Sequence, residues 1–242
     1  MNEQTIDVLA FGAHPDDVEI GCGGTLYKLH QMGYSTGIID LTEGEMGTRG
    51  SVEERYEEAA AAAKILNLSI RENLKIPDGG IEATKENRHK IIEIVRRYKP
   101  EIVFVHHSDD RHPDHIYTNR LVTEACFYSG LKKVDVKGLL PHRPKRIVYY
   151  PISYEFTPSF VVDISEEFEV KLQAIRAYRS QFYNPEYKGE KTFISSKEFM
   201  DNFESRARYY GWIGGVKYAE PFWVREAIVL DDLFSSLTKN KM

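Results

Sequence analysis

The residues with the clearest chemical potential form a dense cluster of histidine and aspartate in the middle of the chain. The segment His106-His-Ser-Asp-Asp-Arg-His-Pro-Asp-His115 holds four of the eight histidines of the sequence, together with three aspartates. Helix capping or a solvated surface does not need such a concentration of these residue types. We therefore interpret the segment as one that binds a ligand or takes part in a reaction.

A second, smaller cluster lies near the N-terminus, where an apolar run ends. Gly12-Ala-His-Pro-Asp-Asp-Val-Glu19 offers an imidazole from His14 and a carboxylate from Asp17, and both groups are ordinary zinc ligands. A plainer interpretation stays open for this segment taken alone. Aspartates at the start of a helix cap free amide groups and complement the helix dipole.

The two clusters share one feature, which is the absence of cysteine. Three protein ligands with one open position are typical of catalytic zinc sites, whereas structural sites have four ligands and usually include cysteine. The residue types therefore indicate a zinc-dependent hydrolase in which the metal activates a water molecule. Histidine and aspartate ligands also accept iron, cobalt or manganese.

Predicted secondary structure brings the two clusters to the same edge of a sheet. Apolar and helical patterns predict strands over 6–11, 34–41 and 102–105, and helices over 18–31, 53–66, 86–98 and 113–129. This alternation indicates an α/β fold, a Rossmann-like three-layer sandwich with a mostly parallel sheet and helices on both faces. Ligands of such folds collect beyond the carboxyl ends of the strands, where both clusters begin.

The second half of the chain has a less regular pattern. It predicts strands over 146–152 and 160–164, a helix over 165–178 that Ser165 caps, a helix over 197–209 and a loop over the site at 184–191. We expect one domain over 1–242. Residues 1–130 build most of the metal site in this prediction, and the C-terminal half completes the sheet and the substrate pocket.

Composition narrows the class of protein. Hydrophobic residues make up 42% and charged residues 29% of the chain, and the net charge of −5 with scattered basic residues argues against a nucleic-acid partner. The sequence has no signal-peptide pattern and no apolar run long enough to cross a bilayer. These features predict a cytoplasmic protein without a membrane partner, in which Cys22 and Cys126 are buried free thiols.

One glycine-rich segment invites a different interpretation. Gly21-Cys-Gly-Gly24 follows a predicted strand, as the glycines of dinucleotide-binding folds do. The glycines lie several residues inside the predicted helix and not in the turn between strand and helix. Close packing of this helix on the sheet explains them better.

The paired motifs resemble those of a known family. Ala13-His-Pro-Asp-Asp17 together with His112-Pro-Asp-His115 is similar to the signature of the LmbE-like, or PIG-L-type, zinc deacetylases, which remove acetyl groups from N-acetylglucosamine conjugates. The segment 41–50 and Glu54-Arg55 also resemble that family. Tyr178-Arg-Ser-Gln-Phe182 and the chain length are most similar to the deacetylase of bacillithiol biosynthesis, which acts on N-acetylglucosaminyl malate. The resemblance implies a homo-oligomer, with a hexamer as one form.

The resemblance also assigns roles to individual residues. One zinc ion per chain is implied to be held by His14, Asp17 and His115. Asp16 is implied to be the general base for the attacking water. His112 is implied to stabilise the oxyanion as a cation, with Asp114 fixing its tautomer and raising its pKa.

The malate part of the implied substrate carries two carboxylates, and an arginine that binds through two hydrogen bonds is the natural partner of a carboxylate. The candidates are Arg49, Arg55 and Arg111 for the carboxylates and Glu45 and Tyr187 for the sugar. Arg55 has a plainer alternative, an ion pair with Glu54 or Glu58 on its own helix. Glu45 and Tyr187 equally suit ordinary loop roles.

Three other functions stay open at the level of sequence. The same chemistry suits another amino sugar, such as N,N'-diacetylchitobiose or inositol-linked N-acetylglucosamine. A non-catalytic zinc-dependent sugar-binding protein would use the same scaffold without releasing acetate. A phosphoesterase has weaker support, because the well-spaced ligands suffice for only one metal ion.

Overall fold

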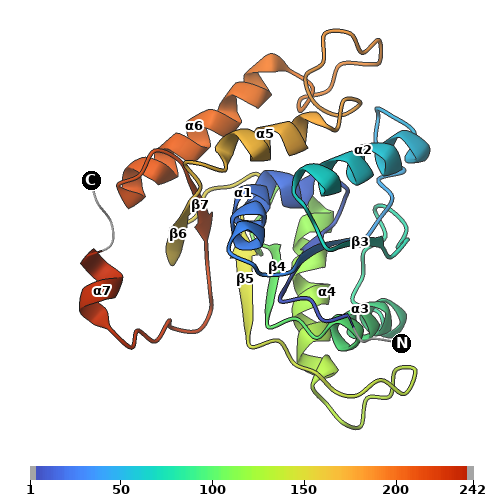
Figure 1. The fold of residues 1–242 in the computed structure, drawn as a ribbon. Helices are drawn as coiled ribbons and strands as arrows, with labels where there is room; N and C mark the ends of the chain where they lie inside the picture. Colours follow the sequence, from blue (N-terminus) through green and yellow to red (C-terminus); the bar gives the residue numbers. More distant parts are fainter. Residues whose placement is uncertain (1–3, 239–242) are drawn as a thin grey trace.

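The computed structural model describes residues 4–238 and has a five-stranded sheet at its centre (Figure 1). The strands are β1 (Val8–Gly12), β2 (Thr36–Asp40), β3 (Ile70–Asn73), β4 (Ile102–His106) and β5 (Arg146–Tyr150). They lie in the order β3-β2-β1-β4-β5, and every neighbouring pair is parallel. The chain adds strands first on one side of β1 and then on the other, so the switch point lies between β1 and β4.

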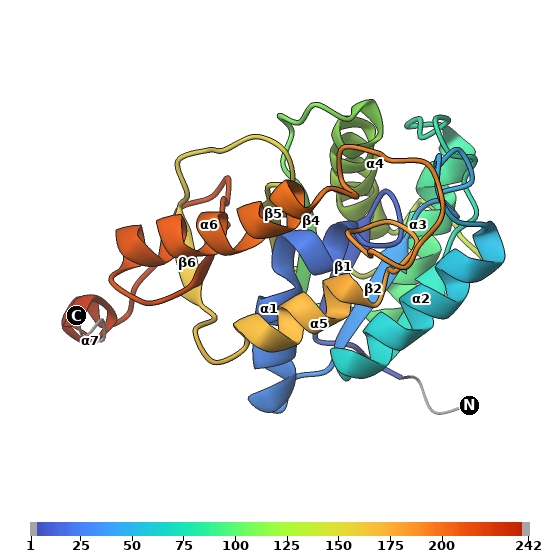
Figure 2. The ribbon, with the colours of Figure 1, turned by 90° about the horizontal axis from the view of Figure 1, so that it is seen from above.

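Helices cover both faces of this sheet, and Figure 2 shows the strands between the two helix layers. One layer contains α1 (Asp17–Gln31), α2 (Val52–Ile65), α5 (Phe168–Arg176) and α6 (Lys197–Gly214), and the other contains α3 (Lys85–Tyr98) and α4 (Pro113–Ser129). Successive residues of β1 point to opposite faces, because Val8 packs in the first core and Leu9 in the second. The predicted three-layer α/β fold is confirmed.

The C-terminal half adds a small antiparallel sheet beside the main one. Strands β6 (Phe160–Asp163) and β7 (Ala219–Phe222) pair with each other, and an isolated bridge between Tyr149 and Trp223 joins this unit to the edge of β5. The last described element is α7 (Leu233–Thr238). Within residues 4–238, no helix has the length and apolar character needed to cross a membrane.

The glycines of α1 serve the packing role that the sequence predicts. A side chain at Gly21 would overlap the ring of Tyr150, and a Cβ at Gly24 would lie 3.0 Å from Ile164. Tyr150 also donates a hydrogen bond of 2.7 Å from its hydroxyl to the carbonyl oxygen of Phe11. These contacts hold the start of α1 close to the end of β1, where the N-terminal chemical cluster lies.

Three expectations differ from the structure. Strands β3 and β7 were not predicted, because Arg71 and Glu72 in the first, and Glu220 and Pro221 in the second, break the apolar pattern. The predicted helix cap at Ser165 is wrong. The Ser165 hydroxyl donates to the Asp163 carboxylate and accepts from the Tyr218 amide, so it belongs to the small sheet and α5 begins only at Phe168.

Both cysteines have the predicted state. Cys22 and Cys126 are buried free thiols on α1 and α4. Burial raises the pKa of the Cys126 thiol to about 12. Neither thiol has the thiolate character of a reactive cysteine at neutral pH.

Candidate active site

The two chemical clusters meet at the switch point of the sheet. His14 and Asp17 follow the carboxyl end of β1, and the His14 amide donates a hydrogen bond of 2.8 Å to the Asp17 carboxylate. His115 lies in the first turn of α4, which follows β4 after a short loop. Because β1 and β4 are neighbours, the two loops open onto the same edge of the sheet.

His14, Asp17 and His115 converge on one small space. Asp17 lies between the two histidines, with one carboxylate oxygen 3.2 Å from His115 Nε2 and the other 3.4 Å from His14 Nδ1. One ligand atom from each residue lies within 4.8 Å of the other two. The structure thus brings the three predicted metal ligands together.

The charge of this site also suits a cation. Burial disfavours the charged ring of His14, but the carboxylates of Asp114, Asp17 and Asp78 outweigh burial and raise its pKa well above the usual value. Burial likewise opposes protonation of His115, yet Asp17 and Asp110 raise its pKa to about 9. Without a metal ion both rings thus hold a proton against the buried carboxylates. A divalent ion such as zinc would displace these protons and take over their positive charge.

Asp110 supports His115 from behind, although the sequence alone assigned it no role. Its Oδ1 lies 3.0 Å from His115 Nδ1, so His115 Nε2 is directed at Asp17. The same carboxylate accepts hydrogen bonds from the amides of His112 and Ser153. A carboxylate behind a ligating histidine fixes the ring and its tautomer, which is a frequent feature of metal sites.

His106 lies against the ligands His115 and Asp17, and the sequence did not predict this supporting role. Its ring is buried, stacks on that of His115 at 4.2 Å between centroids and accepts a hydrogen bond from the Ala13 amide. Its Nε2 lies 3.3 Å from Asp17. Burial lowers the pKa of His106 to about 4, so the ring is neutral and supports the ligands around it.

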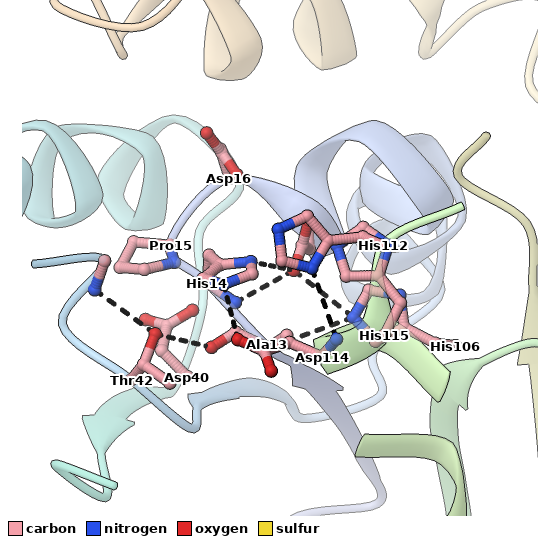
Figure 3. A network of polar contacts seen from close by, with 12 residues as sticks. Ala13, His14, Pro15, Asp16, Asp40, Thr42, His106, His112, Asp114 and His115 are labelled. Atoms are coloured by element: carbon pink, nitrogen blue, oxygen red, sulfur yellow. Dashed lines mark hydrogen bonds and ion pairs between the residues drawn. The ribbon is translucent and has the colours of Figure 1, made fainter. Parts of the chain in front are cut away.

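Asp16, the predicted base, is next to the ligands in sequence but is directed elsewhere. Figure 3 shows its carboxylate pointing away from the ring of His14, and its Oδ2 lies 3.3 Å from Arg55 Nη1. Its φ of 123° is rare for a residue with a side chain, and such strain is frequent at functional sites. Burial raises the pKa of Asp16 to about 7, although Arg55 opposes this shift.

Arg55 does not form the ion pair with Glu54 or Glu58 that the sequence suggests as its plainer role. It is buried, and besides the Asp16 contact its Nη2 donates a hydrogen bond of 2.5 Å to the Pro15 carbonyl oxygen. Glu54 instead completes the capping box of α2, and Glu58 accepts hydrogen bonds from Ser180. Arg55 therefore positions the turn that carries Asp16.

The predicted partnership of His112 and Asp114 takes a different form. The Asp114 carboxylate accepts a hydrogen bond from the Gly79 amide and lies 3.4 Å from His14 Nε2, whereas only the Asp114 backbone amide reaches His112 Nδ1. Burial and the charges of His14 and His115 lower the pKa of His112. The pKa of His112 is thus shifted in the direction opposite to the predicted one. Because Nδ1 accepts a hydrogen bond from the Asp114 amide, the proton of the neutral ring lies on Nε2.

A loop that the sequence did not single out completes the site. Asp78 Oδ1 lies 3.1 Å from His14 Nε2, and its Oδ2 accepts a hydrogen bond from the Met46 amide. The Asp78 amide donates to Glu45 Oε1 at 2.7 Å, so Glu45 holds this loop in place. A lone aspartate in a Pro-Asp-Gly-Gly turn gives no signal in sequence, because such residues are typical of turns.

The two remaining arginine candidates differ in burial, and each contacts an aromatic ring of the C-terminal half. Arg111 is exposed, and its guanidinium lies 5.0 Å from the ring centroid of Phe193. Arg49 is buried, and its guanidinium lies 4.3 Å from the ring centroid of Tyr187 in the segment 184–191. The predicted loop over 184–191 therefore contacts the loop that follows β2.

Comparison with known proteins agrees with this geometry. Residues 9–126 match the family described as PIG-L: GlcNAc-PI de-N-acetylase. A diacetylchitobiose deacetylase from Thermococcus kodakarensis is 33% identical over 227 residues, which cover 88% of this chain and 80% of that protein.

Two solved structures share the fold over most of their length. A conserved protein from Thermus thermophilus is 40% identical with a TM-score of 0.86, covering 95% of this chain and 99% of the other. The N,N'-diacetylchitobiose deacetylase from Pyrococcus horikoshii is 31% identical with a TM-score of 0.79, covering 90% and 82%. The motifs, the fold and the convergent His14, Asp17 and His115 thus agree, and this chain belongs to the PIG-L family of GlcNAc-PI de-N-acetylases.

Proposed function

We propose that this protein hydrolyses the acetamide of an N-acetylglucosamine conjugate and releases acetate. The observation that carries the proposal is the convergence of His14, Asp17 and His115 at the switch point, with Asp16 and His112 beside them. A zinc ion held by the three ligands would polarise the acetamide carbonyl and lower the pKa of the attacking water. Family membership supports the same reaction.

Residues of the chain itself transfer the proton, stabilise the oxyanion and support the metal ligands. Asp16 takes the proton of the attacking water and delivers it to the leaving amine, after its side chain turns from Arg55 towards the ligands. The Nε2 proton of His112 is available to stabilise the oxyanion, since its ring lies 4.9 Å from those of both His14 and His115. Asp110, His106 and Asp114 hold the ligand rings in place.

For the substrate we propose N-acetylglucosaminyl malate. Arg49 and Arg111, which lie in the loops after β2 and β4, support an acidic substituent on the sugar, because guanidinium groups bind carboxylates in a bidentate manner. The relatives described as diacetylchitobiose deacetylases favour N,N'-diacetylchitobiose as the second candidate. Both candidates have the same acetamide, so they differ only in what is attached to the amino sugar.

A substrate panel tests this proposal. Acetate release is measured with zinc-loaded protein on N-acetylglucosaminyl malate, N,N'-diacetylchitobiose and inositol-linked N-acetylglucosamine. We expect kcat/KM to be highest for the malate conjugate. A protein that binds these sugars but releases no acetate from any of them would be a binding protein and not a hydrolase.

A further inference from the structure

The guanidinium group of Arg49 is buried without an anion. The residue is only 7% exposed, and its Nε and Nη2 atoms have no hydrogen-bond partner. No carboxylate in the described part of the chain, residues 4–238, forms an ion pair with it. A guanidinium is charged at every physiological pH, and burying a charge without a partner is costly. Such a group is a candidate for binding an anionic ligand.

The two unpartnered atoms form one edge of the guanidinium. Nε and Nη2 present parallel N–H groups at the spacing of the two oxygens of a carboxylate. Arg71 in this protein shows what that edge does when it has a partner. Its Nε and Nη2 donate hydrogen bonds of 2.8 and 2.9 Å to the two carboxylate oxygens of Asp40. The corresponding edge of Arg49 has no such partner.

The surroundings of Arg49 hold this edge in a defined position. The guanidinium lies 4.3 Å from the ring centroid of Tyr187, a cation–π contact that stabilises the charge in part. The hydroxyl of Tyr187 accepts a hydrogen bond of 3.0 Å from the Gly50 amide, and the Arg49 carbonyl oxygen accepts one of 2.6 Å from Gln181. Two segments distant in sequence therefore fix the arginine from both sides.

Two glycines make this arrangement possible. Gly50 has a φ of +76°, and a Cβ there would lie 2.6 Å from the Ser180 hydroxyl oxygen. A side chain at Gly189 would overlap the ring of Tyr187. Both positions require glycine for the segment 184–191 to lie against the loop that carries Arg49.

The same loop is tied to the proposed metal site. Three residues before Arg49, the Met46 amide donates to Asp78, and Asp78 contacts His14. Glu45 accepts from the Asp78 amide. The loop that carries Arg49 is thus connected to His14 through Asp78.

We propose that the Nε/Nη2 edge of Arg49, beneath the ring of Tyr187, binds a carboxylate of the substrate. Arg49 then selects amino-sugar conjugates whose substituent is acidic over those whose substituent is neutral. This inference rests on the proposed deacetylation. It goes further by assigning the choice of substrate class to one side chain.

The test is the ratio of kcat/KM for N-acetylglucosaminyl malate to kcat/KM for N,N'-diacetylchitobiose. Arg49→Met removes both the charge and the paired donors, and we expect the ratio to fall by about 10- to 100-fold, mostly through KM of the malate conjugate. Arg49→Lys keeps the charge without the paired edge, so an intermediate loss is expected. Arg208→Met, which removes an exposed arginine on α6, serves as the control and should not change the ratio.

Two results would overturn the inference. One is an equal loss on both substrates in Arg49→Met, which indicates a structural role. The other is an unchanged kcat/KM on both substrates in Arg49→Met. If the wild-type protein releases no acetate from either compound, the proposed function fails separately. In that case calorimetry of N-acetylglucosaminyl malate binding to the wild-type protein and to Arg49→Met still decides whether Arg49 binds the carboxylate.

Discussion

Replacing Asp16 by asparagine is expected to lower kcat for acetate release by about 10²- to 10⁴-fold while zinc stays bound. Asparagine has nearly the shape of aspartate, so we expect it to be accommodated at the same backbone conformation, with φ at 123°. It cannot accept the proton of the attacking water. Steady-state kinetics, together with the zinc content of the purified variant, measure the two effects separately.

The matched control is Asp109→Asn, which neutralises an exposed aspartate in the histidine-rich segment. We expect its kcat to equal that of the wild-type protein. If Asp16→Asn kept kcat within about threefold of the wild type, Asp16 would not be the general base. Loss of zinc together with activity would instead assign Asp16 to the stability of the metal site.

Replacing Arg71 by methionine is expected to lower the free energy of unfolding by about 3–5 kcal/mol. Arg71 is nearly buried and contacts two buried carboxylates, at 2.8 Å to Asp40 and 2.5 Å to Glu19. Methionine fills much of the same volume but leaves both carboxylates without a counter-ion. Burial already raises the pKa of Asp40 even with Arg71 beside it. Urea denaturation at neutral pH measures the loss.

Arg97→Met gives the comparison, because Arg97 pairs with Glu72 at 3.0 Å on the surface, where both side chains remain partly exposed. Exposed ion pairs contribute about 0–1 kcal/mol, so this variant should unfold almost as the wild type does. Equal losses of unfolding free energy in the two variants would show that the buried ion pairs of Arg71 stabilise the fold no more than an exposed ion pair does.

The metal ligands could be predicted from sequence because they depend on local features. Each ligand follows the end of a strand, and parallel strands place their carboxyl ends together. The buried strands β1 and β4 are also the most regular apolar runs in the first half of the chain. Residue type and strand position were thus enough to bring the two clusters together, whereas the assignment of His14, Asp17 and His115 as the ligands came from the resemblance to the family.

The arginines and the supporting residues could not be predicted in the same way. The partner of a long side chain depends on the tertiary structure, which the local sequence does not show. Arg55 contacts Asp16 and Pro15, about 40 positions earlier in the chain, and not the glutamates of its own helix. Asp114 likewise accepts from Gly79, in a loop whose position depends on β3. That strand was itself missed, because charged residues interrupt its pattern.

We expect hydrolysis to depend on one metal ion held by His14, Asp17 and His115. The most direct measurement is acetate release by metal-stripped protein during titration with zinc, for the wild type and for His115→Ala. We predict that wild-type activity rises from near zero to a plateau at one zinc per chain, and that His115→Ala stays inactive at that ratio. Full activity in the metal-stripped wild type, or an identical titration curve for His115→Ala, would contradict this account.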